Sequence, residues 1–363
     1  MTPRPPPHQP MPGPIEWLRE NLFSTPLNAV LTLLALVLIW SIVAPFVQWA
    51  LIDAAFEGKS REDCLRREGA CWPFVIERLG QIIYGFYDGT ERWRVDIAYL
   101  LLAAGLFWLT FPRLPGKWAI GGIMLTAYPI AALIMLVGGV LGLPQVPTER
   151  WGGLLLTLVV AVTGIVASLP LGILLALGRR SELPVVRWLS IAFIELWRGV
   201  PLVTVLFMAA NMLPLFLPGG VTINKLLGAL IAVALFSSAY MAEVVRGGLQ
   251  AIDKGQFEAA SAVGLGYWRA MGLVILPQAL RLSIPNIVGN FIGLLKDTTL
   301  VSIIGLFDLL GIIQAGTASA EWATPNTAYT GYVFAGVVFW VMCFGMSRYA
   351  KHMEDILKAG EQR

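Results

Sequence analysis

Apolar residues fall along this chain in long runs that are almost free of charge. The clearest runs extend from Leu27 to Leu51, from Trp118 to Leu143 and from Trp151 to Gly178. An apolar run of about 18 or more residues is long enough to cross the hydrocarbon core of a bilayer as a helix. The pattern therefore predicts an all-α, polytopic membrane protein with about eight transmembrane helices, near 27–49, 96–111, 118–143, 151–177, 188–213, 226–246, 284–305 and 328–348.

The predicted spans divide the chain into four parts. Residues 1–25 form a Pro-rich tail that we expect to be disordered, and it lacks the features of a cleaved signal peptide. Residues 26–150 form a three-helix extension with a long outer loop over 52–95. Residues 151–350 hold the five remaining helices, with a long loop over 247–283, and residues 351–363 form a second tail.

Composition agrees with a membrane protein. Of the 363 residues, 57% are hydrophobic and 13% are charged, and the mean hydropathy is +0.71. Soluble domains carry about 25% charged residues, so a large soluble protein with buried core helices is a poor alternative. The net charge of +3 is not gathered into a basic patch, so we expect no nucleic-acid binding.

The reactive residues exclude several kinds of enzyme. The two histidines, His8 and His352, lie in the terminal tails, so we expect neither a metal site nor a histidine-based catalytic site in the membrane. The chain has no HExxH motif and no GxxxxGK[ST] phosphate loop, so we expect no catalytic residues, no cofactor and no ATP site in it. An intramembrane enzyme with a Ser–Lys dyad is an alternative, but no pattern of residues favours it.

Lysine and arginine in the short loops predict the orientation of the chain. Both termini and four groups of basic residues fall on one side, which is therefore predicted to be cytoplasmic. One segment disagrees, because the outer loop over 52–95 contains seven basic residues. The four groups are Arg113 and Lys117; Arg179, Arg180 and Arg187; Arg246, Lys254, Arg269 and Arg281; and Arg348, Lys351, Lys358 and Arg363.

Two of the three cysteines lie in the outer loop. Cys64 and Cys71 are separated by six residues and face the side expected to be oxidising, where disulfides persist. A disulfide is favoured over two free thiols, and over a metal site that would need more ligands nearby. Cys343 lies in the last predicted helix and is expected to be a free, buried thiol.

The loop after the sixth predicted helix carries the most informative motif. It reads GQFEAASAVG over 255–264 and VILP over 274–277. Residues 258–263 favour a helix that Gly264 ends. The stretch resembles the EAA loop of ABC importer permeases, although Val274 stands where isoleucine is usual. The matching residues, which in that family couple the permease to its ATPase, are Glu258, Ala259, Ala260, Gly264, Leu276 and Pro277.

Three further segments strengthen this resemblance. They read ELWRGVP over 195–201, AEVVRGG over 242–248 and LKDTTL over 295–300. They are similar to the E-x-x-R-G-x-P, A-E-x-x-R-G and K-D-T-S-L segments of polar amino acid permeases, with Thr299 in place of serine. The resemblance covers about 151–356. The longer layout resembles the long permease subunit of general L-amino acid importers and of importers for glutamate, glutamine, aspartate and asparagine.

The resemblance implies a multi-pass subunit of the bacterial inner membrane, with the outer loop in the periplasm. The chain would form half of a pathway for L-amino acids with a second, similar permease, as a heterodimer. A periplasmic binding protein would deliver the amino acid, and two ATPase subunits would bind ATP and Mg. The alternative is a self-sufficient, ion-coupled secondary amino acid transporter, a class that often shows inverted repeats, but no repeat is evident here.

Charged residues inside predicted spans are candidates for the pathway, because they face protein or water. Glu195 and Arg198 are spaced i, i+3 and can pair on one helix face. Glu243 and Arg246 repeat the spacing, and there a structural ion pair is favoured over substrate contact.

The seventh predicted helix carries a polar stripe. Asn286, Asn290, Gly293 and Asp297 share one face, and Lys296 lies beside it. The stripe is able to line the substrate pathway, where Asp297 and Lys296 would meet the ammonium and carboxylate of an amino acid. It is equally able to pack two permeases together, with Asp297 and Lys296 satisfying each other.

Overall fold

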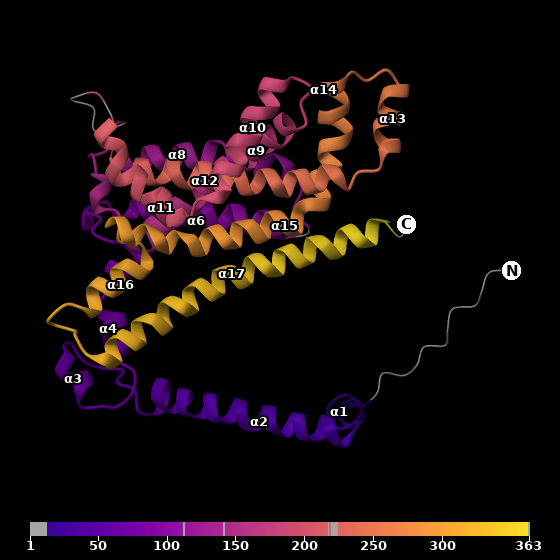
Figure 1. The fold of residues 1–363 in the computed structure, drawn as a ribbon. Helices are drawn as coiled ribbons and strands as arrows, with labels where there is room; N and C mark the ends of the chain where they lie inside the picture. The colour runs from indigo at the N-terminus through magenta and orange to yellow at the C-terminus, as the bar shows by residue number, and fades with distance from the viewer. Residues whose placement is uncertain (1–12, 112, 141, 217, 219–223, 362–363) are drawn as a thin grey trace.

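The computed structural model describes residues 13–111, 113–140, 142–216, 218 and 224–361, and these form helices without a β-strand (Figure 1). Among them, seven helical stretches are long and apolar enough to cross a membrane. These are Pro26–Ile52, Gly89–Thr110, Lys117–Val137, Gly153–Arg179, Lys225–Gln250, Tyr267–Ile304 and Pro325–Asp355. The prediction of an all-α polytopic membrane protein is confirmed.

The first membrane helix stands apart from the rest. Helix α2 (Pro26–Val47) continues as the π-helix η1 (Gln48–Ile52), and no side chain of α2 is buried. Its apolar residues cover all sides, as lipid surroundings require. Figure 1 shows α2 approaching the other helices only near α3 and α4.

The expected disorder over residues 1–25 is wrong in part. Residues 1–12, which include His8, lie outside the described residues, but Pro14–Leu22 forms helix α1. Pro14 occupies the first turn, where its missing N–H costs nothing. Glu16 in the first turn and Arg19 in the last turn complement the helix dipole.

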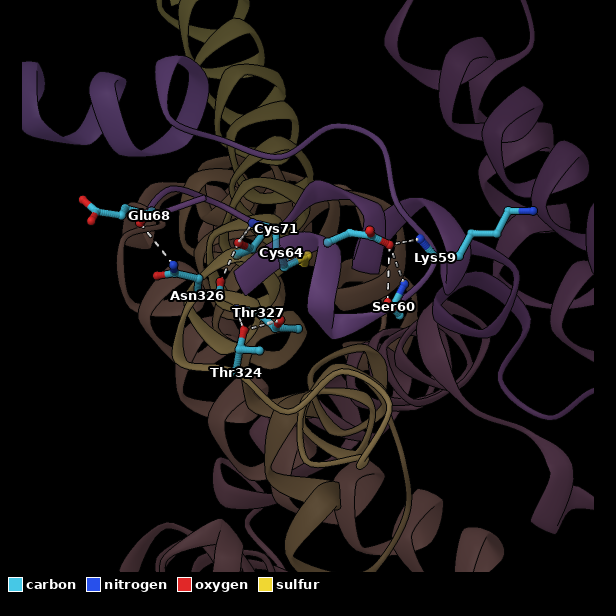
Figure 2. The surroundings of a disulfide bond; sticks show 10 residues. Lys59, Ser60, Cys64, Glu68, Cys71, Thr324, Asn326 and Thr327 are labelled. Atoms are coloured by element: carbon cyan, nitrogen blue, oxygen red, sulfur yellow. Dashed lines mark hydrogen bonds between the residues drawn. A yellow bond between two sulfur atoms is a disulfide. The ribbon is translucent and has the colours of Figure 1, made fainter. Parts of the chain in front are cut away.

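The outer loop folds into a small lobe held by a disulfide between Cys64 and Cys71, whose Cα atoms lie 5.3 Å apart (Figure 2). The predicted disulfide is therefore confirmed. The Cys71 N–H donates to Thr330 Oγ1 at 2.8 Å, and Asn326 Nδ2 donates to the Glu68 carbonyl at 3.1 Å. These bonds fix the lobe to the start of α17 (Pro325–Glu361). The lobe contains α3 (Arg61–Leu65), α4 (Trp72–Glu77), α5 (Leu79–Tyr84) and η2 (Gly89–Glu91).

The rest of the extension is α6 (Arg92–Thr110), α7 (Lys117–Leu125) and α8 (Ala127–Val137). The span predicted over 118–143 is thus two helices that meet at Thr126, whose backbone is not helical. The turn η3 (Thr148–Arg150) then leads into α9 (Gly153–Arg179).

Helix α9 packs along α12 (Lys225–Gln250), and α15 (Leu276–Asp297) packs against both. Small residues allow this close approach. A Cβ atom at Gly172, for example, would lie 2.6 Å from Cγ of Met241. The five-helix core is completed by α17 and a bent pair of helices.

The bent pair corrects the span predicted over 188–213. Helix α10 (Pro184–Gly199) and the stretch Leu202–Met212 form an angle of 101°. Pro201 lacks an N–H, and it disfavours helical backbone at Val200. The second arm consists of α11 (Leu202–Phe207), η4 (Met208–Met212) and η5 (Leu213–Phe216).

The loop predicted over 247–283 is mostly helical. Helix α12 continues to Gln250, and α13 (Lys254–Ala262), α14 (Tyr267–Ala270) and η6 (Met271–Ile275) lead directly into α15. The seventh span therefore begins well before Ile284. Pro277 does not interrupt it, because this residue lies in the first turn of α15, where proline is tolerated. After α15 come η7 (Thr298–Ile304) and α16 (Leu309–Thr317).

Candidate coupling helix and polar pathway

The predicted motif helix is α13, and its two ends are fixed by its own sequence. The Asp253 carboxylate accepts a hydrogen bond from the Gly255 N–H at 2.7 Å and so caps the start. At the other end the Gly264 N–H donates to the Ser261 carbonyl at 3.0 Å, and the Leu265 N–H donates to the Ala260 carbonyl at 3.1 Å. This Schellman motif needs left-handed backbone at Gly264, whose φ is +78°.

One face of α13 is anchored to the core. Ala260 is buried, and the Arg180 guanidinium lies 5.6 Å from the centre of the Phe257 ring. Gln278 Nε2 donates to Gln256 Oε1 at 3.2 Å, which ties α13 to the first turn of α15. Leu276 is partly buried beside this contact, and Pro277 is exposed.

The opposite face of α13 is free. Glu258 and Ala259 are exposed, and Val263 and Trp268 keep about three quarters of their surface, at 75% and 74%. Figure 1 shows α13 and α14 projecting at the end of the molecule opposite α16. A short, well-capped helix with an exposed face of small side chains is suited to fit a groove in another protein.

A charge cluster joins α9, α10 and α12 near this end. Glu243 lies at its centre, 2.6 Å from Arg246, 3.0 Å from Arg179 and 3.8 Å from Arg198. The predicted pair of Glu243 and Arg246 is therefore confirmed. The predicted pair of Glu195 and Arg198 is wrong, because Glu195 pairs with Arg179 at 3.0 Å.

The helix packing explains this error. Helix α10 lies against α9 and α12, so partners on neighbouring helices compete with the i, i+3 neighbour. The sequence interpretation used Arg179 only as a loop charge. The sequence does contain a signal for this role of Arg179. It is a basic residue at the end of α9, and the two helices that pack there, α10 and α12, each carry an acid that needs a partner.

A polar pocket of about 280 Å³ lies between α12 and α15. It brings together Asn290, Gly293 and Asp297 from the predicted stripe. The other two stripe candidates, Asn286 and Lys296, are exposed and lie outside the pocket lining. From α12 the lining includes Phe236, Ser237 and Tyr240.

Sequence reasoning missed the hydroxyls of α12, because Ser237 and Tyr240 sit within an ordinary apolar run. Ser237 Oγ is buried without a hydrogen-bond partner among the described residues. The Arg198 guanidinium lies 5.7 Å from the centre of the Tyr240 ring, which links the pocket to the charge cluster. No ion pair joins Lys296 to Asp297 in the part of the chain that the structure describes.

The chain matches one family across this whole region. Residues 168–356 match the family described as "Binding-protein-dependent transport system inner membrane component", and they include α13, the charge cluster and the pocket. The chain belongs to this family. Its membrane-spanning helices and this membership make it a multi-pass inner membrane protein.

Relatives extend the match beyond the family core. The chain is 49% identical to the "Inner membrane amino-acid ABC transporter permease protein YhdY" of Escherichia coli K12, over 95% of this chain and 93% of that one. It is 38% identical to the "Glutamate/glutamine/aspartate/asparagine transport system permease protein BztC" of Rhodobacter capsulatus, over 99% and 96%. It is 33% identical to the "Glutamate/aspartate import permease protein GltK" of Escherichia coli O6:H1, over 56% of this chain and 90% of that one. The extension is therefore shared with long relatives, while a short relative matches little more than half of the chain.

Proposed function

We propose that this chain is the permease subunit of an ATP-driven importer of L-amino acids. The observation that carries the proposal is the exposed helix α13, which presents the EAA motif in a chain of this family. The names of the long relatives, which are amino acid transport permeases, support the cargo. The chain forms half of the pathway, and a second, similar permease forms the other half as a heterodimer.

Coupling runs from α13 into the membrane. The exposed face with Glu258 and Ala259 docks in a groove of an ATPase subunit, and two such subunits hold ATP and Mg. Movement of α13 reaches α15 through the Gln256–Gln278 hydrogen bond and through η6, which is continuous with α15. Since α15 carries the polar stripe, a shift of α13 changes the pocket.

The pocket suits an amino acid zwitterion delivered by a periplasmic binding protein. The Asp297 carboxylate and the Asn290 side-chain oxygen are acceptors for an ammonium group. Ser237 and Tyr240 are donors for a carboxylate, and Arg198 lies behind Tyr240. Apolar Phe236 and Leu294 complete the lining and contact the cargo side chain.

The orientation follows from the two ends of the molecule. The disulfide lobe lies in the oxidising periplasm, and α13 lies in the cytoplasm with the ATPase. Both termini then face the cytoplasm. The cationic residues of the lobe are an exception to the rule of positive charge inside, and the orientation rests on the disulfide and on the position of α13.

Reconstituted vesicles separate this proposal from the secondary transporter. Uptake of labelled amino acid is measured with this chain alone under a proton or sodium gradient, and with the ATPase, the second permease and the binding protein under ATP. The proposal predicts uptake only in the complete, ATP-supplied system. Gradient-driven uptake by the chain alone would establish the alternative.

A further inference from the structure

The N-terminal extension and the core leave a groove between them inside the membrane. The groove holds about 390 Å³ and is lined by α6, α8, α9 and α12. Buried residues on the extension helices are confined to the end near the lobe, where Val95, Ala98 and Leu136 pack against Trp151 and Leu155 of the core. Farther from the lobe, the extension helices α6 and α8 bury no residues against the core, and the groove lies between them and helices α9 and α12.

The groove is built for an apolar ligand. Its two phenols are already satisfied by protein, because Tyr99 OH donates to the Ile83 carbonyl at 3.0 Å and Tyr128 OH donates to the Ala98 carbonyl at 3.2 Å. Its remaining lining is almost entirely aliphatic and aromatic carbon. The lining offers an amino acid the hydroxyl of Thr163 but no charged partner, so the groove is distinct from the polar pocket between α12 and α15.

The dimensions of the groove select among apolar ligands. The lining on α9 runs from Leu155 to Ala167, a length of about 18 Å at the helical rise. One leaflet of the hydrocarbon core is about 15 Å thick. The groove is therefore about as long as one leaflet is thick.

An apolar groove of this length suits an alkyl chain of the bilayer. A helix about 10 Å across and about 18 Å long occupies about 1,400 Å³, which is more than the groove holds, so a helix of the second permease does not fit within it. The lining segments of α9 and α12 begin close to the end of each helix nearest the lobe, and Trp151 and Tyr99 line the same region, where such residues mark the membrane interface.

We propose that this groove is a binding site for one acyl chain of a bilayer phospholipid from the leaflet nearest the lobe. The acyl chain fills the space between α8 and α9 and completes the packing of the extension on the core. The site exists only where the extension is present, so it is a property of the long permeases.

A photoreactive lipid tests the proposal. The assembled transporter is purified from membranes containing phosphatidylethanolamine with a diazirine in the middle of one acyl chain, and cross-linked peptides are mapped. We expect cross-links on the α9 segment 155–167 to exceed those on α2 several-fold after detergent exchange, although α2 is the more exposed helix. The Ala132→Phe variant, which fills the groove from α8, should lose this excess.

The matched control is Ala131→Phe, which adds the same ring to α8 at an exposed position outside the groove lining. It should keep the excess. Ala132→Leu serves as a smaller filling variant where Ala132→Phe fails to assemble. Equal labelling of α2 and α9, or labelling unaffected by filling the groove, overturns the proposal. Cross-links from the groove to the second permease would also overturn it, because they would place a protein helix there.

Discussion

The Glu243 carboxylate is the shared partner of the arginines in the charge cluster. Three arginines from α9, α10 and α12 meet it, and its side chain is 17% exposed. Among the described residues, Glu195 forms an ion pair only with Arg179, and its side chain is 55% exposed. The sequence placed both acids in motifs, and it predicted the within-helix partner of Glu243 correctly and that of Glu195 wrongly. Partners on neighbouring helices depend on helix packing, which residue spacing does not report.

Glu243→Gln should destabilise the assembled permease. The change leaves three arginines with one exposed acid, and we expect a loss of about 1–3 kcal/mol, because hydrogen bonds to charged groups contribute that much. Thermal unfolding in detergent measures it. Glu195→Gln is the control and should change stability by no more than about 0.5 kcal/mol, as for exposed pairs. Equal effects of the two substitutions would contradict a central role for Glu243.

Asp308 gives a pH dependence whose sign is set by burial. The carboxylate is fully buried and caps α16 by accepting from the Gly311 N–H at 2.9 Å and the Leu310 N–H at 3.3 Å. Burial raises its pKa from 3.8 to about 6. The folded state therefore holds the proton more tightly than the unfolded state, so this group's contribution to stability is greatest below about pH 4 and is lost as pH rises to about 6.

Asp308→Asn should remove that pH dependence. The amide oxygen still accepts one hydrogen bond at the cap, and the variant has no ionisation to lose. Unfolding temperatures of the wild type and the variant are compared from pH 4 to pH 7.5. Their difference should change between pH 4 and pH 6 and then stay constant. A difference that is constant over the whole range would contradict the raised pKa.

At the scale of single elements, α13 shows what a motif predicts well. Its helical residues, its end at Gly264 and its position before Leu276 and Pro277 follow from local sequence, because caps and propensities act within a few residues. The angle between α10 and α11 does not follow in the same way. Pro201 could have marked the break, but the apolar residues on both sides of it mimic one continuous span. Pro129 could likewise have marked the break at Thr126, because a proline cannot donate a hydrogen bond to the carbonyl four residues before it, here that of Leu125.

Gly264→Ala should weaken coupling through the backbone. A Cβ atom at Gly264 would meet nothing within 4 Å, so the cost is conformational. We expect about 1–2 kcal/mol for a non-glycine residue in left-handed backbone. Binding-protein-stimulated ATPase activity and uptake should both fall at normal membrane expression. The control is Gly266→Ala, where φ is −66° and a Cβ atom also meets nothing within 4 Å. Equal activity of the two variants would argue against the Schellman end of α13.

At the scale of the whole molecule, the proposed function requires α15 to connect two distant ends. The exposed α13 lies at one end and the disulfide lobe is fixed to α17 at the other, with α15 between them (Figure 1). Helix α15 carries part of the pocket lining. The sequence predicted the number of spans closely and the disulfide correctly. It did not predict that the lobe docks on α17, since that contact joins residues more than 250 positions apart.

The most direct test of this account measures uptake and ATP hydrolysis in the same vesicles for the wild type and Asp297→Asn. The complete transporter, with its binding protein and labelled amino acid, should show both activities in the wild type. In the variant the coupling helix is intact, so stimulated ATP hydrolysis should persist, while uptake should fall sharply because the pocket has lost its acid. A well-assembled variant with wild-type uptake of several amino acids would contradict the account and leave the polar stripe as packing.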